Sequence, residues 1–161
     1  MPGSESVIIP TSQAAVAQAG YTPWHDRSRA RILSVSTARL DHTTLYRMID
    51  HTAWQLSAAG SCREAYRQLR KNGPLVIFSE CDLPDGTWKD LLNSVSELAQ
   101  PPAVIVTSRL ADAYLWSEVL NLGGFDVLAK PFIEKEVRQV LASAMRYHAE
   151  QPMRRTRAAG M

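Results

Sequence analysis

Residues 75–84 read Leu-Val-Ile-Phe-Ser-Glu-Cys-Asp-Leu-Pro, an apolar run that ends in a carboxylate just before a loop. The first four residues are apolar on both faces, which is typical of a strand covered by helices on both sides. The stretch therefore predicts the central strand of a parallel α/β sheet. In such sheets functional groups gather just outside the carboxyl ends of the strands, so Glu80 is the first candidate functional residue.

Short apolar runs alternate with segments of helical period on both sides of this stretch, which predicts βαβ units. The predicted strands cover residues 31–36, 54–58, 75–79, 103–107 and 125–129. The predicted helices cover residues 39–51, 62–71, 87–98, 111–122 and 133–148. Asn72-Gly73 and Gly123-Gly124 end the second and fourth helices. The fold class predicted is α/β, a three-layer sandwich with a parallel sheet between two layers of helices.

A length of 161 residues favours one domain with two tails. Residues 1–28 are rich in Ser, Ala, Gln, Pro and Gly and predict a flexible N-terminal extension, whose Tyr21 and Trp24 would either dock on the domain or anchor a partner. The domain is placed at residues 29–149. Residues 150–161 follow as a basic tail with Arg154, Arg155 and Arg157.

The bulk composition excludes several classes of protein. The formal net charge of +2 is too small to indicate a polyanion partner. The only apolar run near the start, Val7-Ile-Ile9, is closed by Pro10 and supports neither a signal peptide nor a membrane span. Cys62 and Cys81 lack the spacing of a metal or disulfide framework. We therefore expect a cytoplasmic protein with reduced thiols and no membrane association.

Polar side chains follow four of the five predicted strands. They are Ser36 and Thr37 after the first, Glu80 after the third, Thr107 and Ser108 after the fourth, and Lys130 after the fifth. Because the strands are predicted to be parallel, their carboxyl ends would bring these residues into one pocket. The Lys130-Pro131 bond lies in a tight strand-to-helix connection, where a cis peptide would aim the ammonium group inward.

Three motifs in this order resemble the receiver domain of two-component response regulators, over residues 30–148. They are Glu80-Cys-Asp-Leu-Pro-Asp-Gly86, Val104-Ile-Val-Thr107 and Gly124-Phe-Asp-Val-Leu-Ala-Lys-Pro-Phe132. The resemblance implies the flavodoxin-like fold, with a doubly wound five-stranded sheet of order 2-1-3-4-5. It also implies a signalling module of phosphorelay pathways, not an enzyme, and here a stand-alone one, since no output domain follows.

The chain keeps only part of the functional set that this resemblance implies. In receivers an aspartate at the position of Glu80 accepts a phosphoryl group, and an acidic pair at the positions of Ser36 and Thr37 binds Mg²⁺. Thr107 and Lys130 match the hydroxyl and the lysine that contact the phosphoryl group. Val127 takes the place of the aromatic switch residue.

These departures predict a degenerate receiver. Two neutral hydroxyls cannot replace two carboxylates around Mg²⁺, and loss of the metal removes most of the catalysis available to phosphoryl transfer. We expect no autophosphorylation, no metal and no cofactor, flavin included, because the loop at Ser34–Thr37 has no glycine for a phosphate.

Two roles stay open for Glu80. Its extra methylene would bring the carboxylate towards Lys130 and Thr107, where it would resemble a permanent phosphate with one negative charge in place of about 1.5 to 2. Alternatively, Glu80 and Lys130 form a buried ion pair left after the switch was lost.

Two other functional hypotheses rest on single features. Asp82 is a displaced carboxylate that could accept a phosphoryl group, although Asp82 and Asp85 beside Pro84 are more typical of solvated turn residues. The arginine tail could make the chain a nucleic-acid-associated adaptor, but three charges without a recognition fold give only non-specific contact. Asp41-His42 reads as local charge placement near the start of a helix.

The fourth predicted helix offers a partner surface. Leu115, Val119 and Leu122 form its predicted core stripe, which leaves Tyr114 and Trp116 at the margin. In receivers the surface of the fourth helix, fifth strand and fifth helix binds partners and forms dimers, and exposed aromatic residues are favoured anchors. The expected partner is a kinase, an output protein or a second copy of the chain. The alternative is that Trp116 packs over a neighbouring strand.

Overall fold

The computed structural model describes residues 29–71 and 73–159, with side chains described up to Gln151. The predicted N-terminal extension, residues 1–28 with Tyr21 and Trp24, lies outside the described residues. So do Asn72 and the side chains of the arginine tail.

The chain alternates strands and helices, as predicted. The strands of the main sheet are β1 (Ala30–Val35), β2 (Trp54–Ala59), β3 (Val76–Glu80), β6 (Ala103–Ser108) and β7 (Asp126–Ala129). The helices are α2 (Arg39–Met48), α3 (Cys62–Lys71), α4 (Trp88–Ser96), α5 (Ala113–Asn121) and α6 (Glu134–Ala159). A short antiparallel hairpin of β4 (Asp82–Leu83) and β5 (Gly86–Thr87) follows β3.

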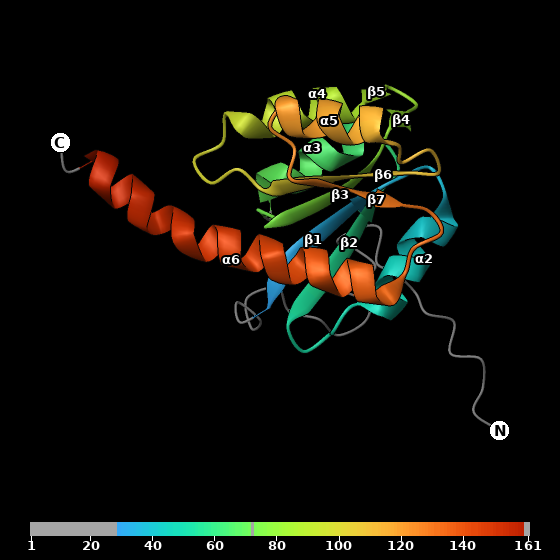
Figure 1. Ribbon diagram of the computed structural model, residues 1–161, viewed down its shortest axis with the longest axis horizontal. Coiled ribbons are helices and arrows are strands. Elements are labelled where there is room, and N and C mark those ends of the chain that lie inside the picture. The colour runs from blue at the N-terminus through green and yellow to red at the C-terminus, as the bar shows by residue number, and fades with distance from the viewer. Residues whose placement is uncertain (1–28, 72, 160–161) are drawn as a thin grey trace.

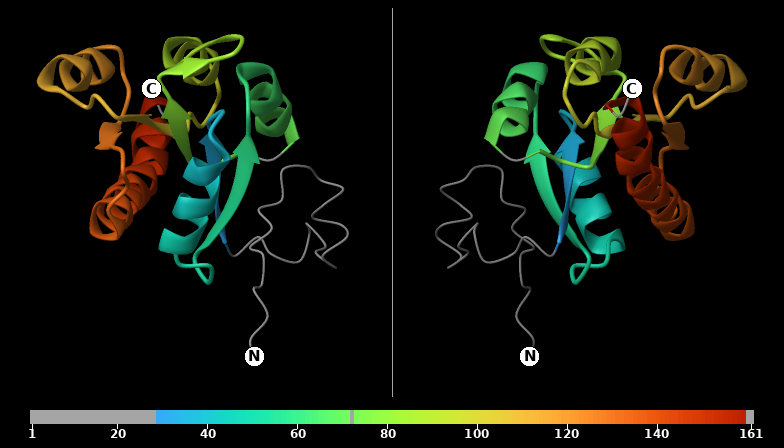
Figure 2. Two further views of the ribbon diagram at one scale, coloured as in Figure 1. Left: turned by 90° about the vertical axis from the view of Figure 1, so that its right-hand side faces the viewer. Right: turned by 90° about the vertical axis from the view of Figure 1, so that its left-hand side faces the viewer.

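The five strands of the main sheet are parallel and lie in the order β2-β1-β3-β6-β7. This is the order 2-1-3-4-5 in strand numbers of the main sheet, so the predicted topology is confirmed. Helices α3, α4 and α5 cover one face of the sheet, and α2 and α6 cover the other (Figures 1 and 2). The carboxyl ends of all five strands therefore meet at one edge.

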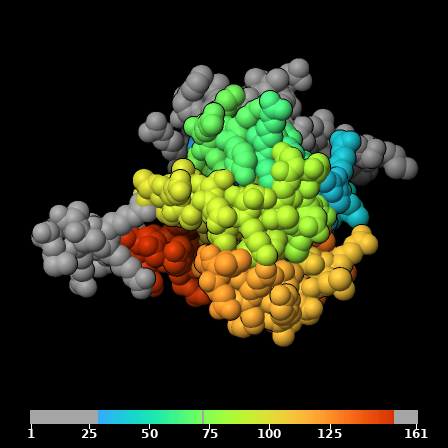
Figure 3. All heavy atoms as spheres, turned by 90° about the horizontal axis from the view of Figure 1, so that it is seen from above, coloured from blue at the N-terminus to red at the C-terminus, as the bar shows by residue number. Residues whose placement is uncertain are grey.

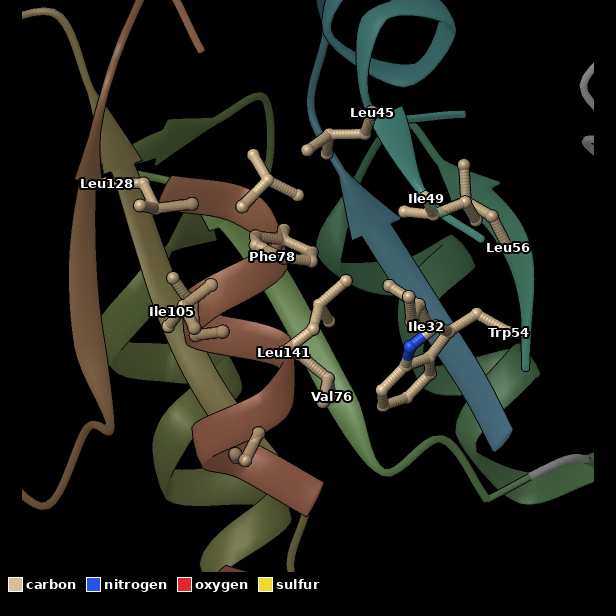
Figure 4. Close-up of a cluster of buried hydrophobic side chains, with 14 residues drawn as sticks. Ile32, Leu45, Ile49, Trp54, Leu56, Val76, Phe78, Ile105, Leu128 and Leu141 are labelled. Atoms are coloured by element: carbon tan, nitrogen blue, oxygen red, sulfur yellow. The ribbon is translucent and has the colours of Figure 1, made fainter. Parts of the chain in front are cut away.

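The sheet separates two apolar cores because side chains alternate along each strand. On the side of α2 and α6, Val76 and Phe78 of β3 pack with Ile32 and Ile105 of the neighbouring strands and with Leu141 of α6 (Figure 4). On the other side, Ile77 of β3 belongs to a second cluster formed with residues of α3, α4 and α5. Residues 76–78 are all at most 1% exposed, which confirms β3 as the central, doubly covered strand.

Several boundaries differ from the sequence-based expectation. Thr87 was predicted to begin a helix, but it caps α4 instead: its hydroxyl accepts a hydrogen bond from the Lys89 N–H, and the Asp90 carboxylate accepts one from the Thr87 N–H. Helix α5 begins at Ala113 because the Asp112 side chain accepts a hydrogen bond from the Leu115 N–H. The predicted core position Leu122 is wrong, because it follows the end of α5 and is 53% exposed.

The last helix is longer than predicted. The sequence predicted a helix that ends at His148 and a tail from residue 150, but α6 continues through Pro152 to Ala159. An interior proline removes one backbone N–H and its ring clashes with the carbonyl four residues earlier, a cost of about 3 kcal/mol, but the residues on the far side of Pro152 are mostly Met, Arg and Ala, which are good helix formers. The basic segment is therefore the end of a helix that extends beyond the sheet (Figure 1).

We predict that Phe78→Ala lowers the free energy of unfolding by about 3–5 kcal/mol, because it removes a large side chain from the middle of a packed core. Leu110→Ala is the matched control, since Leu110 is 80% exposed and its loss should change stability by no more than about 0.5 kcal/mol. Urea denaturation followed by circular dichroism measures both. Similar losses for the two variants would contradict the assignment of Phe78 to the core.

Candidate functional site

The predicted pocket residues do meet at the carboxyl edge of the sheet. Glu80 and Thr107 are paired in the register of β3 and β6, and Ser36 and Thr37 follow the end of β1. The Lys130 N–H donates to the Ser108 carbonyl oxygen at 2.9 Å, so Lys130 follows β7 beside the end of β6. The Lys130-Pro131 bond is cis, as the sequence led us to expect.

The Glu80 carboxylate turns towards the loop between β1 and α2. Its Oε2 atom accepts hydrogen bonds from the Thr37 N–H at 3.1 Å, from the Thr37 hydroxyl at 3.1 Å and from the Ser36 hydroxyl at 3.2 Å. Its Oε1 atom lies 3.3 Å from the Lys130 Nζ atom. Both oxygens of the carboxylate are therefore held within the protein.

Thr107 does not take part in these contacts. It is buried beside Glu80, but the hydrogen bonds described for the Glu80 side chain go to Ser36, Thr37 and Lys130. The expected approach of Glu80 to Lys130 is present, and the expected approach to Thr107 is not. The loop offers a backbone N–H and two hydroxyl groups, and the extra methylene of glutamate lets the carboxylate reach them.

Asp41 is the functional residue that the sequence analysis missed. Its Oδ2 atom lies 2.5 Å from the Lys130 Nζ atom, closer than Glu80, and accepts a hydrogen bond from the Ser36 hydroxyl at 2.7 Å. The side chains of Lys130 and Asp41 are only 10% and 13% exposed. The expected charge placement near a helix start is confirmed, because Asp41 lies in the first turn of α2, but that interpretation missed the ion pair with Lys130. The available signal was its place in the first turn of the helix that begins at the end of β1.

Asp41, Lys130 and Glu80 form an ion cluster, which we call the Lys130 triad. Its members come from α2, from β3 and from the segment after β7, so that three separate parts of the chain converge on one ammonium group. Two carboxylates against one ammonium leave the triad with a formal charge of −1. The hydroxyl and N–H donors of Ser36 and Thr37 offset part of this excess.

Ser36 orders the loop around the triad. Its hydroxyl has one proton to donate, and the 2.7 Å distance to Asp41 against 3.2 Å to Glu80 makes Asp41 its main acceptor. The same oxygen accepts a hydrogen bond from the Ala38 N–H at 3.0 Å. Ser36 thus fixes the start of α2, where Ala38 provides no side-chain cap.

His42, to which the sequence analysis assigned no role, fixes the loop between β1 and α2 by two hydrogen bonds. Its Nε2 atom lies 3.0 Å from the Ser36 carbonyl oxygen and its Nδ1 atom 2.8 Å from the Ser34 hydroxyl. A neutral ring with its proton on Nε2 donates to the carbonyl and accepts from the hydroxyl. Burial of the ring lowers the pKa of His42, against the smaller opposing effects of the Ser36 carbonyl and Asp41, which favours this neutral form.

The electrostatics of the site keep Glu80 ionised. Partial burial acts to raise the pKa of its carboxyl, but the Thr37 N–H and the charge of Lys130 act in the opposite direction. Together they hold the pKa of Glu80 below its ordinary value. Glu80 is therefore a permanent anion at neutral pH.

The donor set does not fit the magnesium ion of functional receivers. Ser36 and Thr37 contribute neutral hydroxyls, and both nearby carboxylates are already paired with Lys130. Among residues 29–71 and 73–159, no group of three or more His, Cys, Asp or Glu side chains is placed to share a metal ion.

Asp82 and Asp85 lie away from the triad. Asp82 is exposed in the β4–β5 hairpin. The expectation that Asp85 is a solvated turn residue is confirmed, since Asp85 is exposed in a turn, but its carboxylate also accepts hydrogen bonds from the Cys62 N–H at 2.8 Å and the Arg63 N–H at 2.9 Å. These two N–H groups lower the pKa of Asp85, and the carboxylate caps the start of α3.

The surface of α5, β7 and α6 exposes the predicted aromatic residues. Tyr114 is 79% exposed and Trp116 is 50% exposed. Trp116 and Val127 line an open groove of about 960 Å³ between α5, β7 and α6. Val127, the residue that the resemblance assigns to the switch position, is half-buried in β7, with its backbone paired to Val106 of β6.

Comparisons with known proteins agree on one family. The sequence model described as Response regulator receiver domain matches residues 32–142. The Two-component response regulator-like APRR1 of Arabidopsis thaliana is 29% identical over 117 residues, 70% of this chain and 19% of that protein. The Transcriptional regulatory protein DpiA of Escherichia coli K12 is 30% identical over 87 residues, 54% of this chain and 38% of that protein. The chain thus spans less than two fifths of the length of these relatives.

Solved structures share the fold. The chemotaxis response regulator CheY4 of Vibrio cholerae superimposes with a TM-score of 0.65 at 19% identity, covering 72% of this chain and 98% of that one. The beryllofluoride-activated NtrC4 receiver domain dimer gives a TM-score of 0.67 at 19% identity, covering 73% of this chain and 98% of that one. None of the helices in the described part of the chain has an apolar stretch long enough to cross a bilayer.

We predict that Glu80→Gln lowers the free energy of unfolding at neutral pH by about 1 kcal/mol, a modest value because the side chain is one quarter exposed and water screens the ion pair. The folded-state pKa of Glu80 is depressed. Its contribution is therefore complete above the ordinary glutamate pKa of about 4.3 and is lost as the pH falls through the lower folded value.

Urea denaturation of wild type and Glu80→Gln from neutral pH down to the acid range measures this difference. His42 has a lowered pKa, so both proteins lose stability first as the pH falls below about 6.5, and subtraction removes that shared effect. A difference that stays constant down to the lowest pH would contradict the ionised state of Glu80.

Proposed function

The chain belongs to the response regulator receiver domain family, which serves two-component signalling, and we propose that this member acts by binding a protein partner without accepting a phosphoryl group. The observation that carries the proposal is the Lys130 ammonium group, which lies between the carboxylates of Asp41 and Glu80. Both carboxylates would have to release this lysine before it could contact an incoming phosphoryl group.

The charge balance of the site argues against phosphoryl transfer. Transfer depends on positioning and on neutralising the negative charge of the phosphoryl group, and Mg²⁺ normally supplies most of that neutralisation. Here the lysine is engaged by two carboxylates, and the formal charge of the triad is already −1. An incoming phosphoryl group would meet a net anion without a metal ion to offset it.

Of the two roles left open for Glu80, the geometry favours a fixed ion cluster over a phosphate substitute. A phosphate substitute should contact both Lys130 and Thr107, whereas Glu80 contacts Lys130, Ser36 and Thr37. Val127 provides no aromatic ring that could swing between two positions. We infer that the receiver is held in one conformation and needs no catalytic turnover.

The groove between α5, β7 and α6 supports a protein-binding role. Tyr114 and Trp116 are large apolar side chains with substantial exposure, and Trp116 lines the groove. Aromatic residues of this kind commonly dominate binding energy at protein interfaces. A second copy of the chain is one partner we propose for this surface, since a related receiver fold was solved as a dimer; a kinase or an output protein is the other class.

No observation favours the two remaining hypotheses. Asp82 is exposed in the β4–β5 hairpin. The contacts of Lys130 and of the Ser36 and Thr37 hydroxyl groups go to Asp41 and Glu80, not to Asp82. The side chains of Arg154, Arg155 and Arg157 lie outside the described residues, so the structure adds nothing to a nucleic-acid role for the tail.

We predict that wild type and Glu80→Asp incubated with acetyl phosphate and Mg²⁺ gain no phosphoryl group by intact mass spectrometry. The triple variant S36D/T37D/E80D is the minimum expected to regain transfer, because it restores both metal ligands and the acceptor. Adding D41N should increase its yield, since Asp41 would otherwise hold Lys130 and repel a carboxylate at position 36.

A hydroxylamine-sensitive phosphoryl adduct on the wild type would contradict the proposal. Peptide mapping would then decide between Glu80 and Asp82, and an adduct retained in Glu80→Gln but lost in Asp82→Asn would establish the displaced acceptor.

We predict that Trp116→Ala weakens binding at the α5–β7–α6 surface by about 2 kcal/mol or more, roughly thirtyfold, as expected for an aromatic interface anchor. For self-association, sedimentation equilibrium gives the dimer dissociation constants directly. Leu40→Ala is the matched control, because Leu40 is 73% exposed on α2, none of whose residues lines the groove. Equal dissociation constants for wild type and Trp116→Ala would remove this surface from any dimer that forms.

A further inference from the structure

The outer face of α3 carries a row of positively charged side chains, which we call the α3 basic stripe. It consists of Arg63, Arg67, Arg70 and Lys71. Intervals of three and four residues place all four on one side of a helix, and all four side chains are exposed. Figure 3 looks onto the side of the molecule where α3 and α4 lie at the surface.

The stripe points away from the protein because the opposite side of α3 is packed. Cys62 and Ala65 are buried, and Tyr66 and Leu69 pack against the same core cluster as Ile77 of β3. The helix therefore cannot rotate to redistribute its charges. The surface is distinct from the Lys130 triad and from the α5–β7–α6 groove.

Acidic residues near the stripe are used elsewhere. The Glu64 carboxylate accepts a hydrogen bond from the Gly60 N–H at 2.9 Å, and Asp85 accepts from the N–H groups of Cys62 and Arg63. Among the residues that the structure describes, no ion pair reaches the stripe, whereas Lys89 of α4 is paired with Glu118 and Arg138 of α6 with Glu134.

The stability of α3 does not account for this arrangement. Like charges three and four residues apart destabilise a helix, and a cation in the first turn, as at Arg63, opposes the helix dipole. Only Arg70 and Lys71, in the last turn, are favourably placed for the dipole. An external anion that pairs with the whole row would offset the repulsion.

We infer that the α3 basic stripe docks an acidic helix of a partner protein, with carboxylates repeated at intervals of three and four residues. Four residues of a helix span about 6 Å, so carboxylates at this spacing on an adjacent helix match the row charge for charge. Three of the four cations are arginines, whose planar groups bind carboxylates through two parallel hydrogen bonds.

The geometry favours a protein helix over a nucleic acid. The exposed face of α3 offers a duplex a row of cations, which would contact phosphates and give only salt-dependent, non-specific binding. Proteins that bind single strands place aromatic rings between their cations for base stacking, but Tyr66, the only aromatic residue of α3, is packed against the core.

The test uses the full chain and a fluorescein-labelled peptide rich in Glu and Ala, with Glu at intervals of three and four residues along one helical face. A second peptide of identical composition spreads its Glu residues around the helix. Fluorescence anisotropy at low and at physiological salt measures both dissociation constants. The variant R63Q/R67Q/R70Q removes three stripe charges, and K135Q/R138Q/R146Q removes three exposed charges from α6 as the matched control.

We expect the stripe variant to bind the one-faced peptide about tenfold more weakly than wild type, the combined effect of three exposed ion pairs, and the α6 variant to bind within about twofold. Circular dichroism should show both variants folded, since glutamine is a good helix former.

Equal losses in the two variants, or equal binding of the two peptides by wild type, would overturn the inference, because either result would reflect net charge alone. Tighter binding to a DNA duplex, an RNA single strand or phosphatidylserine vesicles than to the one-faced peptide, lost in the stripe variant, would also overturn it and assign the stripe to that ligand.

Discussion

The carboxyl edge of the sheet depends on one interaction, the ion pairing of the Lys130 ammonium group with the carboxylates of Asp41 and Glu80. It joins the first turn of α2, the end of β3 and the segment after β7, which lie up to 89 residues apart in the sequence. An ammonium group this little exposed requires a carboxylate partner, because leaving it unpaired would cost several times the value of a surface ion pair. The arrangement of the surrounding loop follows from this need.

The layers beneath the site explain why the cluster can be rigid. Ser36 contacts both carboxylates, and neutral His42 fixes the Ser36 carbonyl from within the layer formed by α2. Leu45 of the same helix is buried in the core with Phe78. Helix α2 therefore links the two layers: His42 fixes the hydrogen-bonded loop at the edge of the sheet, and Leu45 packs in the apolar core.

Much of the fold was readable from the sequence. The doubly apolar run ending at Glu80 identified the central strand, and the alternation of patterns located the other four strands to within one or two residues. The sequence reading failed where an interaction was distant or polar. Asp41 and Asp85 looked like ordinary loop and helix-start residues, because nothing local indicates that their partners are Lys130 and the N–H groups of α3. Pro152 also suggested that α6 ends before it, but the helix continues to Ala159 because the residues that follow favour helix.

The sequence by itself determined the alternation of strands and helices and the hydroxyl side chains at positions 36 and 37, because hydrophobic period and residue identity are local properties of the chain. Its motifs indicated the family, and the strand order followed from that resemblance. Only the tertiary structure decided how the remaining charges pair. Glutamate at position 80 is long enough to reach either Thr107 or the β1–α2 loop, and the loop offers more donors. The pairing of Glu80 with Lys130, Ser36 and Thr37 was therefore decided by geometry, since charge and hydrogen-bond energies depend on distances that residue types do not specify.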